Sequence, residues 1–149
     1  VKHYWKEALK KTNITGFRGY TNRPTFIEWL LDAIRNQKSL PLFTDFFTCT
    51  IDSETFAELA LFVAATEYSG IINIASSECL SKKEFALEVA QALGTKITSM
   101  QDASVQSLIP SRADSLGLDC HKAQTLLGIK MPSSKTVINN LLNQEMAYK

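Results

Sequence analysis

Four tyrosines are the side chains of this chain best suited to proton transfer, because a phenol can act as an acid or a base when a nearby lysine lowers its pKa. On a helix that lysine has to lie one turn away, as in a Tyr-x-x-x-Lys pair. At this spacing Tyr4 is followed by an alanine, Tyr20 by a proline and Tyr68 by an isoleucine. Tyr148 is next to the last residue, so no residue lies one turn after it. The sequence therefore predicts no catalytic tyrosine.

The glycines and histidines predict no cofactor or metal site either. Gly16 and Gly19 are spaced as GxxG, but a pyrophosphate cradle needs GxGxxG or GxxGxxG between a strand and a helix. His3 and His121 have no metal ligand at a suitable spacing, since the neighbouring Cys120 would point about 100° away on a helix. We therefore predict no catalytic, cofactor-binding or metal-binding residue in this chain.

The composition is that of an ordinary soluble domain. The 149 residues include 16 basic and 15 acidic side chains, which leave a net charge of +1. The charges are interleaved, which argues against nucleic acid or an anionic membrane as a partner. The longest apolar run, residues 59–65, is far shorter than a membrane span, and no cationic-then-apolar leader opens the chain.

Three cysteines bear on the compartment. Cys49, Cys79 and Cys120 are widely spaced and form no CxxC motif. An odd number of cysteines without that motif is typical of reduced thiols, so we predict a cytoplasmic protein. Val1 is not a translation start, and we expect further sequence upstream of it.

The elements that must position any functional group alternate between helices and short strands. Two capping boxes, Thr25 with Glu28 and Ser81 with Glu84, predict helix starts, and Gly94 predicts a stop. Hydrophobic periodicity and polar breakers extend the pattern along the chain. They predict helices at 2–11, 26–36, 54–68, 82–93, 120–127 and from 134, and strands at 14–18, 40–44, 71–75 and 96–100.

Four segments of the chain form a recognisable series: WLLDAIRNQKSLPLFTD, TFAELALFVAA, GIINIASSECLSKKEFALEVAQALG and SRADSLGLDCHKAQTLLG. In this order they resemble the C-terminal half of extended short-chain dehydrogenase/reductases, and most of all dTDP-4-dehydrorhamnose reductases. The resemblance implies an α/β fold, the C-terminal portion of a Rossmann-type enzyme, with helices and a few short, mainly parallel strands. Residues 1–149 would then be the substrate-binding portion and would include the last strands of the nucleotide-binding sheet.

The resemblance also implies a function. In this family the N-terminal half holds NAD(P) and a Ser/Thr, Tyr, Lys catalytic set, and the C-terminal half covers a nucleotide sugar. This chain would thus bind the nucleotide sugar, while an N-terminal half outside it would bind NAD(P). The expected reaction is hydride transfer to a 4-keto sugar nucleotide. The expected protein partner is the missing N-terminal half or another copy of the chain. A homo-oligomer is the expected assembly.

Four residues are candidates for substrate binding. The resemblance places Arg112 in an Arg-x-Asp motif whose arginine meets substrate phosphates, which a guanidinium can hold through two hydrogen bonds. The alternative is that Arg112 only pairs with Asp114 or caps a loop. Thr48 and Thr50 lie in the extended segment that in the family follows the substrate cleft. Trp29 has the shape to stack on a base, although an aromatic residue in such an apolar helix is more often part of the core.

Two departures from the family pattern leave the reaction open. The family's usual Pro-Thr pair is Cys49-Thr50 here. The polar residue that often precedes the phenylalanine of the family's first helix is Thr25 here. The alternatives are a sugar-nucleotide epimerase and a non-catalytic binding or regulatory subunit with the same fold. The strands at 14–18 and 71–75 would also lack their family neighbours, so we expect unpaired sheet edges.

Overall fold

The computed structural model describes residues 8–19, 23–110 and 114–147. The helices are α1 (Phe26–Arg35), α2 (Ser53–Ala64), α3 (Lys82–Ala92), α4 (His121–Leu127) and α5 (Ser134–Ala147), with a short 3-10 helix at Val105–Ser107. The strands are β1 (Ala8–Lys11), β2 (Asn13–Thr15), β3 (Leu40–Phe43), β4 (Phe47–Thr48), β5 (Thr50–Asp52), β6 (Gly70–Asn73), β7 (Leu80–Ser81), β8 (Met100–Ala103) and β9 (Ser115–Leu116). Within these ranges no helix has the length and apolar character to cross a membrane.

The strand pairing is mainly parallel. Strand β1 pairs with β6, β2 with β5, β3 with β8 and β4 with β9, all in parallel, and only the described pair β4–β7 is antiparallel. The helices lie between these short strands in the sequence, which is the order that parallel pairing needs. The expected α/β class is therefore confirmed.

Both predicted capping boxes form. The Thr25 hydroxyl accepts the Glu28 N–H, and the Glu28 carboxylate accepts the Thr25 N–H at 2.7 Å. The same exchange joins Ser81 and Glu84 at 3.1 and 2.8 Å. Gly94 then takes a φ of +66°, a left-handed conformation that glycine adopts without strain and that follows the end of α3.

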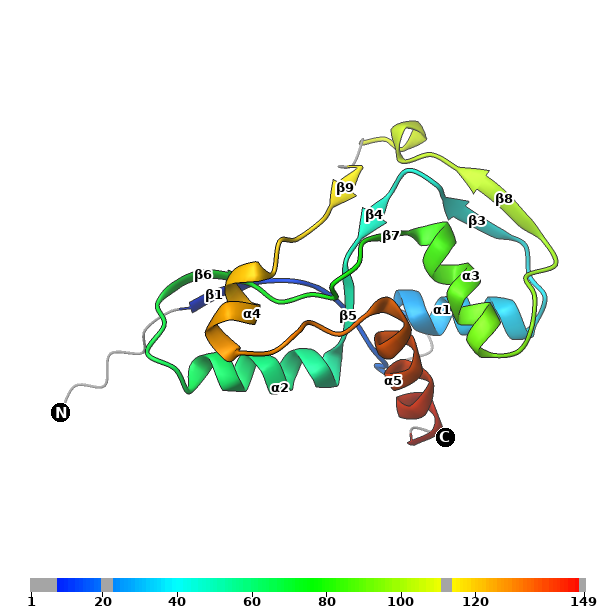
Figure 1. Cartoon of the computed structure of the whole chain (residues 1–149). Coiled ribbons are helices and arrows are strands. Elements are labelled where there is room, and N and C mark those ends of the chain that lie inside the picture. The colour runs from blue at the N-terminus through cyan, green and yellow to red at the C-terminus, as the bar shows by residue number, and fades with distance from the viewer. Residues whose placement is uncertain (1–7, 20–22, 111–113, 148–149) are drawn as a thin grey trace.

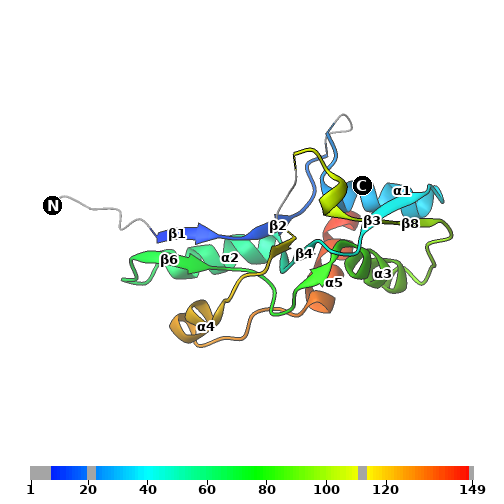
Figure 2. The ribbon, with the colours of Figure 1, turned by 90° about the horizontal axis from the view of Figure 1, so that it is seen from above.

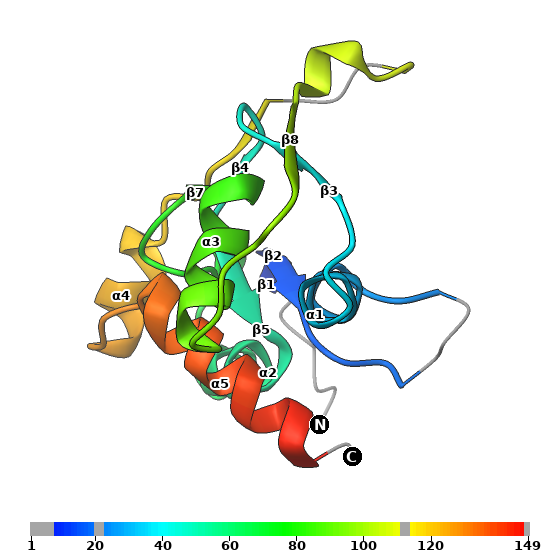
Figure 3. The same cartoon turned by 90° about the vertical axis from the view of Figure 1, so that its right-hand side faces the viewer.

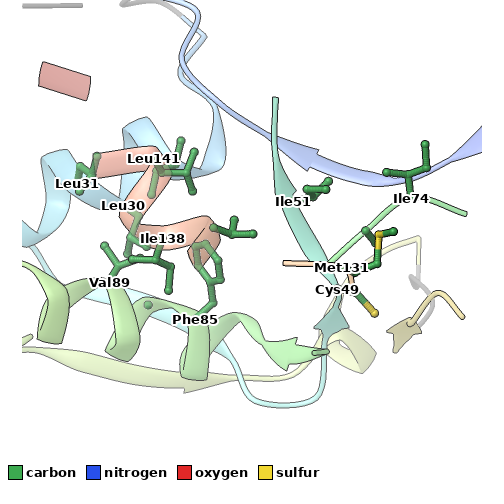
Figure 4. Close-up of a cluster of buried hydrophobic side chains, with 14 of the residues drawn as sticks. Leu30, Leu31, Cys49, Ile51, Ile74, Phe85, Val89, Met131, Ile138 and Leu141 are labelled. Atoms are coloured by element: carbon green, nitrogen blue, oxygen red, sulfur yellow. The ribbon is translucent and has the colours of Figure 1, made fainter. Parts of the chain in front are cut away.

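One end of the molecule, which we call the helical region, contains α1, α3 and α5 with β3 and β8 (Figure 1). Figure 3 shows α5 lying across α3, with α1 beside them. The space between these helices is filled by buried apolar side chains. Figure 4 shows Leu30, Leu31, Phe85, Val89, Ile138 and Leu141 gathered there.

The other end, which we call the strand region, contains β1, β6, α2 and α4 (Figure 1). Seen from above, β1 and β2 follow one line, with β6 and α2 beside them (Figure 2). Helix α2 buries Leu59 and Val63, but Leu61 and Phe62 are 70% and 52% exposed. The strand region therefore buries only part of its apolar surface.

Asp52 joins the two regions. It ends β5, caps α2 by accepting the Thr55 N–H at 2.9 Å, and is fully buried. Its carboxylate also accepts hydrogen bonds from Gln144 Nε2 at 2.9 Å and Asn140 Nδ2 at 3.4 Å, both on α5. The start of α2 is thereby tied to the helical region.

Three sequence predictions about local structure are wrong. Residues 8–11 form β1 rather than the end of a helix, because their backbone pairs with β6 and this pairing overrides local helix propensity. The strand predicted at 96–100 begins only at Met100, where it pairs with β3. Helix α2 ends at Ala64, four residues before the predicted end. The remainder of the first predicted helix, residues 2–7, lies outside the described residues.

The expectation of three reduced cysteines is also wrong. Cys49 and Cys79 are joined in a disulfide, while Cys120 is free and buried. The reason lies in the pairing of β4 with β7, in which Phe47 faces Ser81 and Thr48 faces Leu80. Continuing this register by one residue places Cys49 opposite Cys79, a proximity that their separation in sequence does not reveal.

Candidate functional site

An open cavity of about 510 Å³ lies at the junction of the two regions, a volume in the range of small-molecule sites. Its walls come from β2 and the loop after it, the start of α1, strands β4 and β5, and the first residue of α3. The described residues that line it are Asn13, Ile14, Thr15, Gly16, Phe17, Arg18, Pro24, Thr25, Phe26, Phe46, Thr48, Thr50, Ser53, Lys82 and Leu116.

The loop wall of the cavity is held against the start of α1. Glu28 Oε1 accepts the backbone N–H groups of Arg18 and Gly19 at 2.8 and 2.9 Å, and the Thr25 hydroxyl donates to the Gly16 carbonyl at 2.6 Å. Burial raises the pKa of Glu28, but the N–H donors of Thr25, Gly19 and Arg18 outweigh it, so the pKa lies below its usual value. The ionised carboxylate thus organises this loop.

Gly16 is required by close packing in the same wall. A Cβ atom at this position would lie 2.4 Å from Ser53 Oγ and 3.0 Å from Ser53 Cβ. Both residues line the cavity. The glycine therefore lets the loop after β2 approach the first turn of α2.

Two predicted site residues, Thr48 and Thr50, are brought together in the cavity. Both are buried, and their hydroxyl oxygens are 3.0 Å apart. Thr15 lines the same cavity and is 9% exposed, and its hydroxyl has no hydrogen-bond partner among the described residues. The cavity therefore contains a group of buried hydroxyls.

Lys82 is a cavity residue that the sequence reasoning missed. Its ammonium donates to Thr48 Oγ1 at 3.1 Å and lies 4.4 Å from the centroid of the Phe26 ring. Desolvation by burial lowers the pKa of Lys82 to about 8. One signal was available: a lysine directly after the N-cap Ser81 lies at the positive end of the helix dipole, where a cation is unfavourable.

Trp29, a third predicted site residue, is not among the described residues that line the cavity. Trp29 is partly buried, packs against the core, and has its ring centroid 5.9 Å from that of Phe26. Arg112 lies outside the described residues, and so does its alternative pairing with Asp114. The roles of Trp29 in base stacking and of Arg112 in phosphate binding stay predictions.

The described lining of the cavity has the chemistry of an anion-binding site. This described lining combines hydroxyls with the cations Arg18 and Lys82 and the rings of Phe26 and Phe46, and it includes no carboxylate or imidazole. In the described ranges no group of three or more His, Cys, Asp and Glu side chains could hold a metal ion. The arrangement suits an anionic ligand with an aromatic or sugar portion.

Comparison with known proteins identifies the fold. No family model and no curated protein matches the sequence. Among solved structures, dTDP-4-dehydrorhamnose reductase from Bacillus anthracis str. Ames in complex with NADP matches with a TM-score of 0.75 at 13% identity. The Bordetella bronchiseptica enzyme WbmG in complex with NAD and UDP matches with a TM-score of 0.68 at 20% identity. UDP-N-acetylglucosamine 4-epimerase from Bacillus cereus matches with a TM-score of 0.68 at 19% identity.

These matches cover nearly the whole chain but less than half of each solved protein. The coverage of this chain is 89%, 92% and 93%, and that of the three solved chains is 46%, 43% and 48%. The chain has the fold of the C-terminal part of dTDP-4-dehydrorhamnose reductase and related epimerase and dehydratase enzymes. The resemblance read from the sequence is thus confirmed at the level of the fold.

Proposed function

We propose that this chain is the nucleotide-sugar-binding part of an NAD(P)-dependent enzyme similar to dTDP-4-dehydrorhamnose reductase, which reduces a 4-keto sugar nucleotide. The observation that carries the proposal is the cavity lined by hydroxyls, cations and aromatic rings, in a chain with the fold of the C-terminal part of such enzymes. Residues 1–149 form the substrate-binding portion together with the last strands of the nucleotide-binding sheet. A dinucleotide-binding half outside these residues completes the enzyme.

In this proposal the chain positions the substrate. Thr48 and Thr50 form hydrogen bonds to phosphate or sugar oxygens, since their hydroxyls lie together in the cavity. Arg112 contributes a bidentate contact to the phosphates, and Trp29 stacks on the base. The walls of the cavity exclude water from the part of the sugar that they enclose.

The described residues do not fit a nicotinamide cofactor. Gly16 and Gly19 lie in a loop that leads to α1, and the loop amides of Arg18 and Gly19 are already bonded to Glu28. No glycine-rich cradle is formed by the described part of the chain, and in this proposal the cofactor is bound mainly by the N-terminal half. Bound NAD(P)H would supply the hydride, and the residues described here would hold the sugar.

The epimerase is the second candidate, and the match to UDP-N-acetylglucosamine 4-epimerase favours it. An epimerase would need the same nucleotide-sugar cavity but would return the hydride to its substrate, with no net use of cofactor. A non-catalytic subunit would bind the nucleotide sugar without changing it. The three functions share the cavity and differ in the fate of the sugar.

Turnover by the full-length protein separates these candidates. The protein is incubated with NADPH and a dTDP-4-keto-6-deoxy sugar, and separately with NAD+ and a nucleotide sugar that carries a 4-hydroxyl, and cofactor absorbance and sugar products are followed together. A reductase consumes one NADPH for each sugar reduced. Interconversion of nucleotide sugars without net cofactor loss indicates an epimerase, and tight binding without product indicates the non-catalytic subunit. Absence of any nucleotide-sugar binding would overturn the proposal.

A further inference from the structure

The charge of Lys82 is enclosed without a compensating carboxylate. Its ammonium lies between two rings, 4.4 Å from the Phe26 centroid and 5.6 Å from the Phe46 centroid, and donates to Thr48 Oγ1. Among the described residues no Asp or Glu forms an ion pair with it. An ammonium has three donors, so Lys82 can bond to Thr48 and still bind a ligand.

The position of Lys82 disfavours its positive charge. It is the first residue of α3, beside the positive end of the helix dipole, and its surroundings disfavour the charged form. With a pKa of about 8 the side chain is still mostly protonated at pH 7. A leucine or methionine would fill this space without the repulsion from the helix dipole and without the desolvation of a charge. An anion bound beside the ammonium would relieve both.

The cavity supplies the other groups that a bound anion needs. The Thr48 and Thr50 hydroxyls lie 3.0 Å apart beside the ammonium, and the Thr15 hydroxyl has no partner among the described residues. Thr15 is buried and lines the same cavity. The described lining contains no carboxylate that would repel an anion.

We propose that Lys82 contacts a phosphate oxygen of the nucleotide-sugar diphosphate, beside the Thr48 hydroxyl, and thereby gives the cavity its preference for nucleoside diphosphates over nucleosides. This inference rests on the proposed function, because it takes the cavity as the nucleotide-sugar site. The diphosphate is the ligand because it is the anion that nucleotide sugars share, whichever sugar they carry. Lys82 is thus a specificity-determining residue of the cavity.

Calorimetric titration with dTDP, UDP, thymidine and uridine tests the proposal on the full-length protein. Lys82→Gln removes the charge and keeps a polar side chain of similar length. We expect it to weaken binding of the matching diphosphate about 10- to 100-fold, the usual loss for a charge-assisted hydrogen bond, and to leave nucleoside binding unchanged. Lys82→Arg keeps the charge and should retain most of the diphosphate affinity.

Lys83 provides the matched control. It is the next residue of α3, but its ammonium pairs with Asp102 at 2.6 Å and it does not line the cavity. Lys83→Gln should bind diphosphates like the wild type. If Lys82→Gln lost affinity equally for nucleoside and diphosphate, or kept its diphosphate affinity, the role of Lys82 would be overturned while the proposed function would stand. Failure of the wild type to bind either diphosphate would overturn the proposed function as well.

Discussion

The helical region and the strand region differ in how completely they bury their apolar residues. In the helical region, Leu30, Val89 and Leu141 are 0% exposed between three helices (Figure 4). In the strand region, α2 buries one face and exposes Leu61 and Phe62 on the other. The side chain of Ile71 on β6 is 52% exposed. The three helices of the first region enclose their part of the core, whereas the second region has an apolar surface that nothing in the described chain covers.

This difference fits the proposed division of the enzyme. The resemblance assigns the segments that contain β2 and β6 to a sheet shared with a dinucleotide-binding half, and β6 belongs to the strand region. A half that covers α2 and extends this sheet would bury the exposed apolar side chains. The cavity lies at the junction of the regions, so the proposed half would also come close to a sugar bound there.

The largest expected effect is the loss of core packing in the helical region. Leu141→Ala removes a fully buried side chain of α5, and we expect it to lower the free energy of unfolding by about 2 to 5 kcal/mol. Leu61→Ala, the matched change on the exposed face of α2, should cost less than about 1 kcal/mol in the isolated chain. Urea denaturation of both variants measures the difference. Equal losses would show that the two regions are equally closed.

The next effect concerns the link between the regions. Asp52→Ala removes the acceptor of hydrogen bonds from Gln144, Asn140 and the Thr55 N–H, and should lower the free energy of unfolding by about 2 to 3 kcal/mol. Glu54→Ala changes an exposed neighbour in the first turn of α2 and serves as the control. The link would be unimportant if thermal melting gave the same midpoint for both variants.

A smaller effect is expected at Lys82, with a defined pH dependence. Lys82→Met removes an enclosed charge and should raise the free energy of unfolding by about 1 to 2 kcal/mol at pH 7. The pKa of Lys82 is about 8 in the folded protein, against an ordinary lysine value of 10.5 that applies to the unfolded chain. The wild type therefore gains stability relative to the variant as pH rises from about 8 to 10.5, because only the folded lysine has lost its proton. A stability difference that does not change with pH would contradict this environment.

Substitutions on the exposed face of α2 should change the free energy of unfolding least but should clearly change self-association. We expect the isolated chain to self-associate, and the double variant Leu61→Ser, Phe62→Ser should raise the fraction of monomer seen by light scattering. Met146→Ser, an equally exposed position on α5 in the helical region, should not. A wild-type chain that is already a stable monomer would contradict the expectation.

The parts of this molecule that local chemistry determines could be predicted from the sequence. Thr25 with Glu28 and Ser81 with Glu84 mark the helix starts, because a capping box needs only residues three apart. Thr48 and Thr50 could also be predicted as site residues, since the resemblance places them in an extended segment, whereas Thr15 was not predicted to line the cavity. In contrast, the pairing of residues 8–11 with β6 depends on a segment some 60 residues away.

Two features needed the tertiary structure. Cys49 and Cys79 become neighbours only through the register of β4 with β7. Lys82 and Lys83 are identical and adjacent in sequence, yet one points into the cavity and the other pairs with Asp102 on the surface. The dipole of α3 makes both lysines unfavourable but does not show which of them is enclosed.

Hydrogen exchange with mass spectrometry tests the central claim, that the cavity at the junction is the nucleotide-sugar site. The full-length protein is compared with and without saturating dTDP or UDP. The account predicts slower exchange in peptides that cover residues 46–53 and 80–84, which carry Thr48, Thr50 and Lys82, and little change at the C-terminal end of α2. Protection confined to other segments, with the peptides of the cavity unchanged, would contradict it.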